Sequence, residues 1–254
     1  MKRHAIVIGA GGGIGRALVD ALSQGEVAGD SSPDHETDQE TFSVTAISRG
    51  HDPDRDACSV VDWIESTYSE DNIERICHRL LRENIRPDYV FICNGVLHGD
   101  AFQPEKRLEA FDPDAFMQVI DVNARLPLLW LKHLVPVLKQ GERCVVTAFS
   151  ARVGSIGDNG LGGWYSYRAS KSALNMLLKT ASVELARRLP AVKLVAFHPG
   201  TTDTELSRPF QSRVPEGQLL DSDFVARRVI SIVQTLDADG ELSYLDWQGE
   251  TVPW

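Results

Sequence analysis

Short apolar runs recur along the chain and alternate with segments that repeat apolar residues at helical spacing. The runs are rich in β-branched residues, as in strands buried on both faces of a parallel sheet, and they cover 5–8, 42–47, 58–62, 89–93, 143–148, 192–196 and 242–245. Helical patterns cover 16–22, 72–83, 113–139 (with Pro127 and Pro136 as expected kinks), 165–189 and 221–236. This alternation predicts an α/β fold: one Rossmann domain over 1–254, a doubly wound parallel sheet of about seven strands with helices on both faces.

A glycine cluster follows the first apolar run and opens the first predicted helix. The common G-x-G-x-x-G spacing fails because its third glycine falls on Ile14, whereas Gly9, Gly13 and Gly15 fit G-x-x-x-G-x-G, with Gly12 in the same turn. Glycines let the backbone approach a phosphate closely, and a helix N-terminus attracts anions. The turn therefore predicts a nucleotide site, with a βα turn that binds no ligand as the alternative.

One segment shows neither the apolar runs typical of strands nor the helical spacing of apolar residues. Residues 25–41 are acidic and rich in small residues, so they are interpreted as an exposed insert, with a regulatory or partner-binding loop as the alternative.

Composition narrows the class of protein. The 254 residues are 43% hydrophobic and carry a formal net charge of −10, which argues against nucleic acid or an anionic membrane as partner. No apolar run approaches the ~20 residues that span a bilayer, and the basic start, 1–4, is too short for a signal peptide. The cysteines are scattered, without metal-ligand spacing, which predicts a reducing cytoplasmic setting and no metal; they are Cys58, Cys77, Cys93 and Cys144.

Tyr167 and Lys171 stand four residues apart at the start of the helix predicted over 165–189, so they share one face. A free phenol has a pKa near ~10, and a neighbouring ammonium lowers it. Tyr167 is therefore a candidate general acid/base with Lys171 as its electrostatic partner. Ordinary helix-surface residues are the alternative for this pair alone.

The second strand ends at Ser48 and Arg49. At this position of a dinucleotide-binding fold an acidic residue selects NAD, and a basic one accommodates the 2′-phosphate of NADP. We therefore expect NADP(H), with NAD(H) as the alternative because position 12, where some NADP-dependent relatives carry a basic residue, is glycine. Arg16 is the candidate to compensate.

Taken together, these motifs resemble the classical short-chain dehydrogenase/reductases nearly end to end, and within them the C-factor and sniffer-type carbonyl reductase branch. The likeness is carried by the segments 154–159, 162–175 and 198–204. It implies a nicotinamide cofactor and hydride transfer between that cofactor and a carbonyl or alcohol carbon.

The resemblance also assigns roles. It implies that Lys171 holds the nicotinamide ribose and that Asn123 positions a water in the proton relay. It places Asp62 near the adenine, Asn94 and Gly95 beneath it, and Thr201 and Thr204 over the carboxamide and phosphates. The same cofactor site takes in Pro199, Gly200 and Thr202.

One position departs from the family pattern. The family serine, which hydrogen-bonds the substrate oxygen, stands three residues before a glycine, and here that position is Ala151 before Gly154. Ser150 is one residue earlier, and a shift of one residue on a strand turns a side chain to the opposite face. Ser150 is therefore not an automatic substitute, and it is a candidate for this hydrogen bond only where the local loop geometry brings its hydroxyl, or that of Ser155, into the site.

The expected function is an NADPH-dependent carbonyl reductase acting on an aldehyde, ketone or quinone, as a homo-oligomer (dimer or tetramer) formed through the helices of Asn123 and Tyr167. Residues 205–219 would form a substrate lid, and the candidate pocket residues are Leu97, His98, Trp164, Tyr165, Leu206 and Phe210. The alternative is a catalytically weak or inactive NADP(H)-binding regulatory or signalling protein. A lyase or epimerase is a more distant third.

Overall fold

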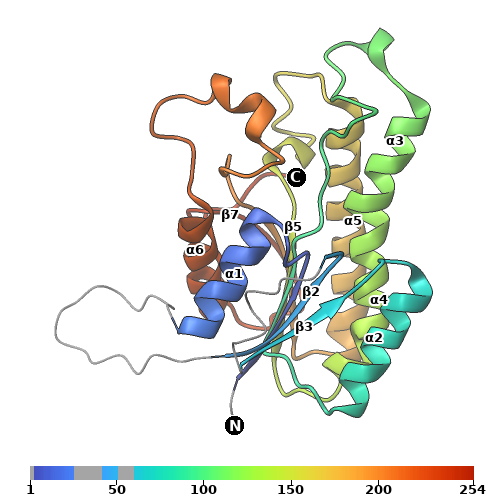
Figure 1. Ribbon diagram of the computed structural model, residues 1–254, viewed down its shortest axis with the longest axis vertical. Coiled ribbons are helices and arrows are strands. Elements are labelled where there is room, and N and C mark those ends of the chain that lie inside the picture. The colour runs from blue at the N-terminus through green and yellow to red at the C-terminus, as the bar shows by residue number, and fades with distance from the viewer. Residues whose placement is uncertain (1–2, 26–41, 51–59) are drawn as a thin grey trace, which may run out of the picture.

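The computed structural model describes residues 3–25, 42–50 and 60–254, and these form a seven-stranded parallel sheet between two layers of helices (Figure 1). The strand order is β3-β2-β1-β4-β5-β6-β7. The strands are β1 (His4–Ile8), β2 (Ser43–Ser48), β3 (Val61–Glu65), β4 (Tyr89–Ile92), β5 (Cys144–Phe149), β6 (Val192–His198) and β7 (Leu242–Asp246). This confirms the doubly wound α/β fold. The order reverses beside β1, where ligands of such sheets bind.

The helices cover both faces of the sheet. One face packs against α1 (Gly13–Gln24) and α6 (Ser222–Gln234), and the other against α2 (Glu70–Arg82), α4 (Leu126–Leu138) and α5 (Tyr165–Arg188). Alternate residues of β1 enter opposite cores: Ile6 and Ile8 face α4, while Ala5 and Val7 face α1. No helix in the described part of the chain is long and apolar enough to span a bilayer.

The helix predicted over 113–139 is interrupted before its prolines. It consists of α3 (Pro113–Ile120), a π-helical turn (Asp121–Arg125) and α4, which contains Pro127 in its first turn and Pro136 in its interior. Proline has no N–H, so the carbonyl of Asn123, four residues before Pro127, lacks its α-helical partner. The π-helical turn therefore contains Asn123, which is expected in the active site from the sequence.

The third strand begins later than predicted. The pattern indicated 58–62, but β3 is Val61–Glu65, because its register is set by pairing with β2, from Val44 opposite Val61 to Ser48 opposite Glu65. It is an edge strand with an exposed face, so local apolarity does not mark its ends. Of the insert expected over 25–41, only Gly25 lies within the described residues.

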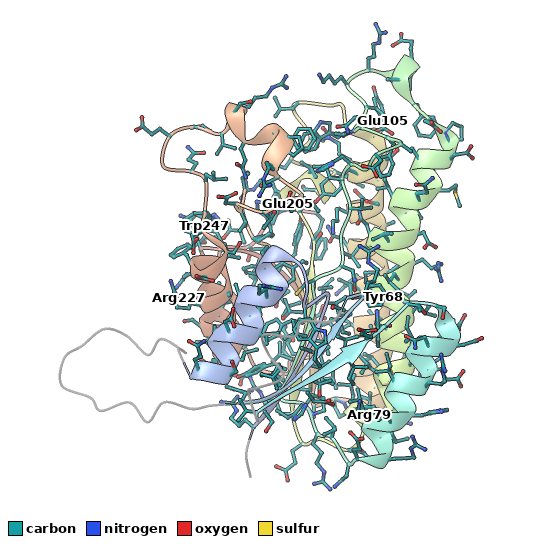
Figure 2. The ribbon with its side chains drawn as sticks, in the orientation of Figure 1. Tyr68, Arg79, Glu105, Glu205, Arg227 and Trp247 are labelled. Atoms are coloured by element: carbon teal, nitrogen blue, oxygen red, sulfur yellow. The ribbon has the colours of Figure 1, made fainter. Side chains whose placement is uncertain are left out.

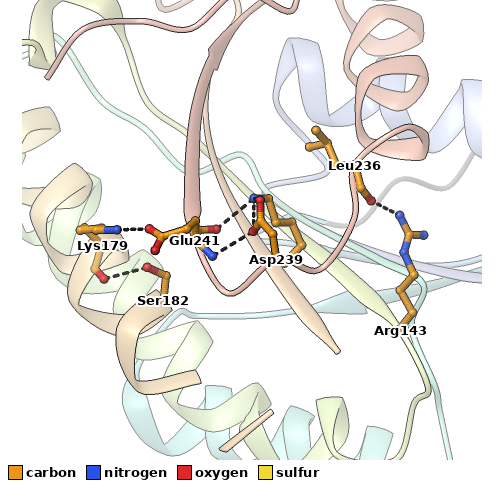
Figure 3. Close-up of polar contacts among 7 residues, drawn as sticks. Arg143, Lys179, Ser182, Leu236, Asp239 and Glu241 are labelled. Carbon is orange, nitrogen blue, oxygen red and sulfur yellow. Dashed lines mark hydrogen bonds and ion pairs between the residues drawn. The ribbon is translucent and has the colours of Figure 1, made fainter. Parts of the chain in front are cut away.

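A polar network ties the last crossover to the amino ends of β6 and β7 (Figure 3). The buried Lys193 of β6 donates to the carboxylate of Asp239 at 2.6 and 2.8 Å and to the carbonyl of Glu241 at 3.0 Å. Lys179 of α5 pairs with the Glu241 carboxylate, and Arg143 donates to the Leu236 carbonyl. These contacts fix the end of the sheet opposite to the glycine turn.

Candidate active site

Two adjoining cavities open along the carboxyl ends of β1, β2 and β4. One has a volume of about 380 Å³ and the other of about 420 Å³. They share six lining residues, so they form one continuous cleft; these are Gly11, Gly12, Arg49, Cys93, Asn94 and Gly95. The cleft lies where the strand order reverses, as expected for a dinucleotide in this fold.

The glycine turn is shaped by close contacts. A Cβ on Gly15 would lie 2.2 Å from the Gly9 carbonyl oxygen, and one on Gly13 would lie 2.7 Å from Cγ2 of Thr204. Gly9 has a φ of +84°, which favours glycine. The N-cap residue of α1, Gly12, contributes no side-chain cap, and the first turn holds no acidic residue. The positive end of α1 therefore faces the cleft with its N–H groups uncapped by side chains.

Ser48 and Arg49 lie at the end of the cleft formed by the smaller cavity, which Arg16 also lines. The Ser48 hydroxyl donates to the Gly50 carbonyl, and the exposed Arg49 borders both cavities. The structure thus brings together the basic residues that the sequence selected for a 2′-phosphate.

Asp62 lines neither cavity. It lies mid-strand in β3, opposite Thr45, and accepts a hydrogen bond from Arg79 of α2 at 2.8 Å. Trp63 and Tyr68 line the smaller cavity instead, and Trp63 donates to the Gly50 carbonyl at 2.9 Å. Trp63 is the central residue of β3, and Tyr68 follows its carboxyl end, so a third strand extended to Glu65 would have pointed to Tyr68.

Tyr167 and Lys171 meet in the larger cavity, one turn apart on α5. The Lys171 Nζ donates to the Phe149 carbonyl at 2.7 Å and lies 5.8 Å from the centre of the Tyr167 ring. Burial raises the pKa of Tyr167 and lowers the pKa of Lys171 to about 7. Burial is the largest cause of both shifts, and each opposes the charged form of its group.

Asn123 is completely buried behind this pair. Its Oδ1 accepts from the Val96 N–H at 2.7 Å, and its Nδ2 donates to the Val96 carbonyl at 2.8 Å and to Ser170 Oγ at 3.0 Å. The side chain thus joins the loop after β4 to α5. Both donors of its amide are engaged, so the groups of Asn123 that can still accept from a water are its backbone carbonyl and the second lone pair of Oδ1.

The side chains of Ser150 and Ala151 point in different directions. Ala151 belongs to the apolar cluster that contains Tyr167 and Leu97. The Ser150 hydroxyl donates to Asn175 Oδ1 at 2.6 Å, although the residue borders the cavity. Ser155 is buried and its Oγ accepts from the Asp158 N–H at 3.0 Å. Neither hydroxyl occupies the place of the Ala151 side chain beside Tyr167.

Residues 3–214 match the family model described as short chain dehydrogenase. The chain belongs to the short chain dehydrogenase family. This family consists of oxidoreductases, and membership in it explains both the sequence motifs and the cleft beside the glycine turn.

Curated relatives agree with this assignment. The chain is 32% identical over 142 residues to 1-hydroxy-2-glutathionyl-2-methyl-3-butene dehydrogenase of Rhodococcus sp. (strain AD45), covering 56% of this chain and 58% of the relative. It is 33% identical over 133 residues to C-signal of Myxococcus xanthus, covering 52% and 75%. The alignment thus spans little more than half the length of the Rhodococcus dehydrogenase.

Solved structures share the fold over the whole chain. The carbonyl reductase Sniffer of D. melanogaster superposes with a TM-score of 0.78 at 20% identity, covering 100% of both chains. The NADPH-bound carbonyl reductase from chicken fatty liver has a TM-score of 0.81 at 19% identity, covering 99% of both. At these identities the likeness concerns the fold.

The other residues expected at the cofactor, from the family likeness or, for Ile14, from its place in the glycine turn, fall into two groups. Those that line the larger cavity are Ile14, Asn94, Gly95, Pro199 and Thr204. Those that line neither cavity are Gly200, Thr201 and Thr202, which form the turn after β6, where the Thr202 hydroxyl donates to the Pro199 carbonyl at 3.3 Å.

The expected substrate residues divide in the same way. Leu97, His98 and Leu206 line the larger cavity. Trp164 and Phe210 pack on the cluster around Tyr167, with their rings 5.1 Å apart, whereas Tyr165 is exposed. Sequence reasoning missed Cys93, which borders both cavities, and Glu205, whose carbonyl oxygen lies 3.2 Å from His98 Nε2.

The cleft fits the nicotinamide dinucleotide that the family implies. It combines a glycine cradle that a Cβ would fill, the uncapped N-terminus of α1 and the buried Asn94 Oδ1, which has no partner among the described residues. In contrast, the described residues contain no cluster of three or more His, Cys, Asp or Glu that could hold a metal ion.

Proposed function

We propose that the chain is an NADPH-dependent carbonyl reductase in which Tyr167 is the proton donor. The observation that carries this proposal is the buried Tyr167–Lys171 pair, which lines the larger cavity of the cleft beside the glycine turn. Supporting it, structures with the same fold include carbonyl reductases that were solved with NADPH or NADP bound.

The residues divide the chemistry of reduction among them. A bound nicotinamide supplies the hydride to the carbonyl carbon. Tyr167 donates its proton to the carbonyl oxygen, so that an alcohol forms. The phenolate then regains a proton from the Lys171 ammonium, which is recharged by the water of the relay. Lys171 also holds the nicotinamide ribose, and the Asn123 carbonyl, which lacks its α-helical partner, accepts from the water that feeds the relay.

NADP(H) is proposed over NAD(H) because of Arg49. Its guanidinium borders both cavities, Arg16 faces the same cavity, and Ser48 ends β2 between them. An arginine at this point suits the planar geometry of a phosphate, whereas an NAD site carries a carboxylate here. In the described part of the chain, neither cavity is lined by a carboxylate at that end.

The substrate is proposed to be an aldehyde, ketone or quinone with an apolar substituent. Leu97 and Leu206 line the cavity beside Tyr167, and Trp164 and Phe210 continue the apolar cluster toward the lid proposed over 205–219. Apolar walls with few polar groups bind carbonyl compounds by excluding water from the reacting oxygen.

A second candidate is an NADP(H)-binding regulatory protein with weak or no turnover. The observation that favours it is Ala151: the hydroxyl of the family serine is missing beside Tyr167, and losing an oxyanion donor costs about 2.7–4 kcal/mol of transition-state stabilisation. The complete Tyr167–Lys171 arrangement favours the reductase.

We also propose a cytoplasmic homodimer. A groove of about 510 Å³ runs between α4 and α5 and is lined by apolar side chains that include Leu128, Val135 and Ala181. Covering these helices with a second copy would bury that apolar surface. The described cysteines, Cys77, Cys93 and Cys144, are free thiols, which suits a reducing compartment.

The proposal is tested by titrating the protein with NADPH and with NADH, and then following nicotinamide absorbance with a panel of alkyl and aryl carbonyls. Tighter NADPH binding with carbonyl-dependent oxidation is expected. Tight NADPH binding without turnover on any carbonyl would favour the regulatory candidate. Tighter binding of NADH would overturn the assignment of Arg49.

A further inference from the structure

The helix that carries Tyr167 and Lys171 does not cap its own N-terminus. The N-cap position of α5 is Trp164, which contributes no side-chain cap, and the first turn contains no acidic residue. A helix start leaves N–H groups without intrahelical partners, and these need acceptors when they are buried. Ser166, in this first turn, is buried, so its polar groups require partners inside the protein.

A glutamate from a distant loop supplies them. Glu105 is only 5% exposed and lies where α5 begins (Figure 2). Its carboxylate oxygens accept from the Ser166 N–H at 3.3 and 3.2 Å, and Oε1 also accepts from the Ser166 hydroxyl. These are charge-assisted bonds to the positive end of a helix, the most favourable setting for a buried carboxylate.

The backbone of Glu105 also holds the strained turn before α5. Its carbonyl accepts from the Trp164 N–H at 2.5 Å. Gly162, Gly163 and Trp164 all have left-handed φ values, of 65°, 66° and 53°. For Trp164 that conformation costs on the order of 1–3 kcal/mol and persists only where the surroundings fix it. Glu105 therefore holds two consecutive features, the strained turn and the first turn of α5.

These two features carry the groups that would meet the substrate. The Trp164 ring packs edge-on against Tyr167, 6.2 Å between centres, and tilted against Phe210 at 5.1 Å. Tyr167 follows Ser166 directly. The loop of Glu105 also contains Leu97 and His98, which line the larger cavity. Glu105 thus joins the substrate side of the cleft to the proton donor.

We propose that Glu105 is a positioning residue that sets the Tyr167 phenol and the Trp164 ring in their working geometry. The proposal rests on the function proposed above, because it assigns Glu105 a role in that same reaction. Displacing a reacting group by about 1 Å can cost 10²-fold in rate, so loss of this anchor reduces kcat.

The test compares Glu105→Leu, Glu105→Gln and Asp112→Ala. Leucine fills the space among Leu97, Phe102 and Val119, where the adjoining void is only about 10 Å³, so it removes the acceptors and leaves little room for a substituting water. Glutamine restores both contacts, since its Oε1 accepts from the N–H and its amide donates to the hydroxyl. Asp112 caps α3 by accepting from the Asp114 and Ala115 N–H groups, so it controls for loss of a helix cap elsewhere.

We expect Glu105→Leu to lower kcat for carbonyl reduction by about 10- to 100-fold with an unchanged Kd for NADPH. Glu105→Gln should keep kcat near wild type, and Asp112→Ala should lower stability without lowering kcat. A folded Glu105→Leu variant with wild-type kcat would overturn the proposal, as would an equal loss in Asp112→Ala.

Hydrogen exchange of the peptide that covers residues 160–170 provides a readout independent of turnover. Loss of protection in Glu105→Leu, but not in Asp112→Ala, is expected, and unchanged protection would overturn the anchoring role. Absence of carbonyl turnover in the wild-type protein would instead refute the proposed function, while the exchange comparison would still test Glu105.

Discussion

Position 151, where the family pattern has a serine and this chain has alanine, bears on catalysis and not on cofactor binding. The alanine packs in the cluster around Tyr167, while the neighbouring Ser150 hydroxyl donates to Asn175, 25 residues away in the chain. A side chain at 151 therefore faces Tyr167, and one at 150 faces Asn175, two turns further along α5. The proposed oxyanion contact is reached from 151.

We predict that Ala151→Ser raises kcat for carbonyl reduction by about 10²-fold, because it restores a donor of the kind worth about 2.7–4 kcal/mol. Ser150→Ala should change kcat little and lower stability, since it leaves the Asn175 oxygen without its partner. Steady-state kinetics of both variants with NADPH shows whether the oxyanion contact is reached from position 151 or is made by Ser150. An unchanged rate in Ala151→Ser, with a large loss in Ser150→Ala, would assign the contact to Ser150.

Lys171 gives a prediction on stability and pH. Burial lowers its pKa from 10.5 to about 7, so between pH 7 and 10.5 the unfolded chain binds a proton that the folded chain does not. The contribution of Lys171 to folding stability therefore rises with pH across this window, and the full cost of burying the ammonium applies below pH 7.

Lys171→Met removes that cost together with the bond to the Phe149 carbonyl. The variant should be more stable than wild type by about 1–3 kcal/mol at pH 6, and the difference should shrink toward pH 10. Urea unfolding at both pH values measures it. A difference that does not depend on pH would show that the lysine titrates normally.

At the scale of elements, the last crossover depends on Lys193. Its ammonium is buried in β6 and is paired with Asp239, whose own side chain is half exposed. Asp239→Ala leaves the Lys193 ammonium with the Glu241 carbonyl as its acceptor. We therefore predict that this variant loses about 2 kcal/mol of unfolding free energy. Adding Lys193→Met removes the buried charge and should recover part of the loss. Denaturant melts of the single and double variants test this. Equal losses in both would contradict it.

The sequence predicted those elements whose pattern is local. The runs of β1, β4, β5 and β6 are buried on both faces, and Tyr167 and Lys171 meet because residues four apart share a helix face. The ends of β3 depend on pairing with β2, so the strand continues to Glu65. Asp62, which the family likeness placed near the adenine, lies within it and lines neither cavity. Glu105 reaches Ser166 across 61 residues, a contact that no local pattern encodes.

At the scale of the whole molecule, the α4–α5 groove is the proposed dimer surface. We predict that Leu128→Arg converts the dimer to a monomer. Arg125, Lys132 and Arg188 also line this groove, so a further cation buried there strongly opposes association. Sedimentation velocity measures the mass, and Glu216→Gln on the exposed lid segment is the matched control. A wild-type protein that sediments as a monomer would refute the interface.

The proposed reduction depends on one proton transfer, from Tyr167 to the carbonyl oxygen, and one measurement tests it directly. Carbonyl-dependent oxidation of NADPH is followed in the wild-type protein and in Tyr167→Phe, with the Kd for NADPH measured in both. We predict turnover in the wild type and its loss in Tyr167→Phe, with NADPH binding retained. Full activity in Tyr167→Phe would contradict the assignment of Tyr167 as the proton donor.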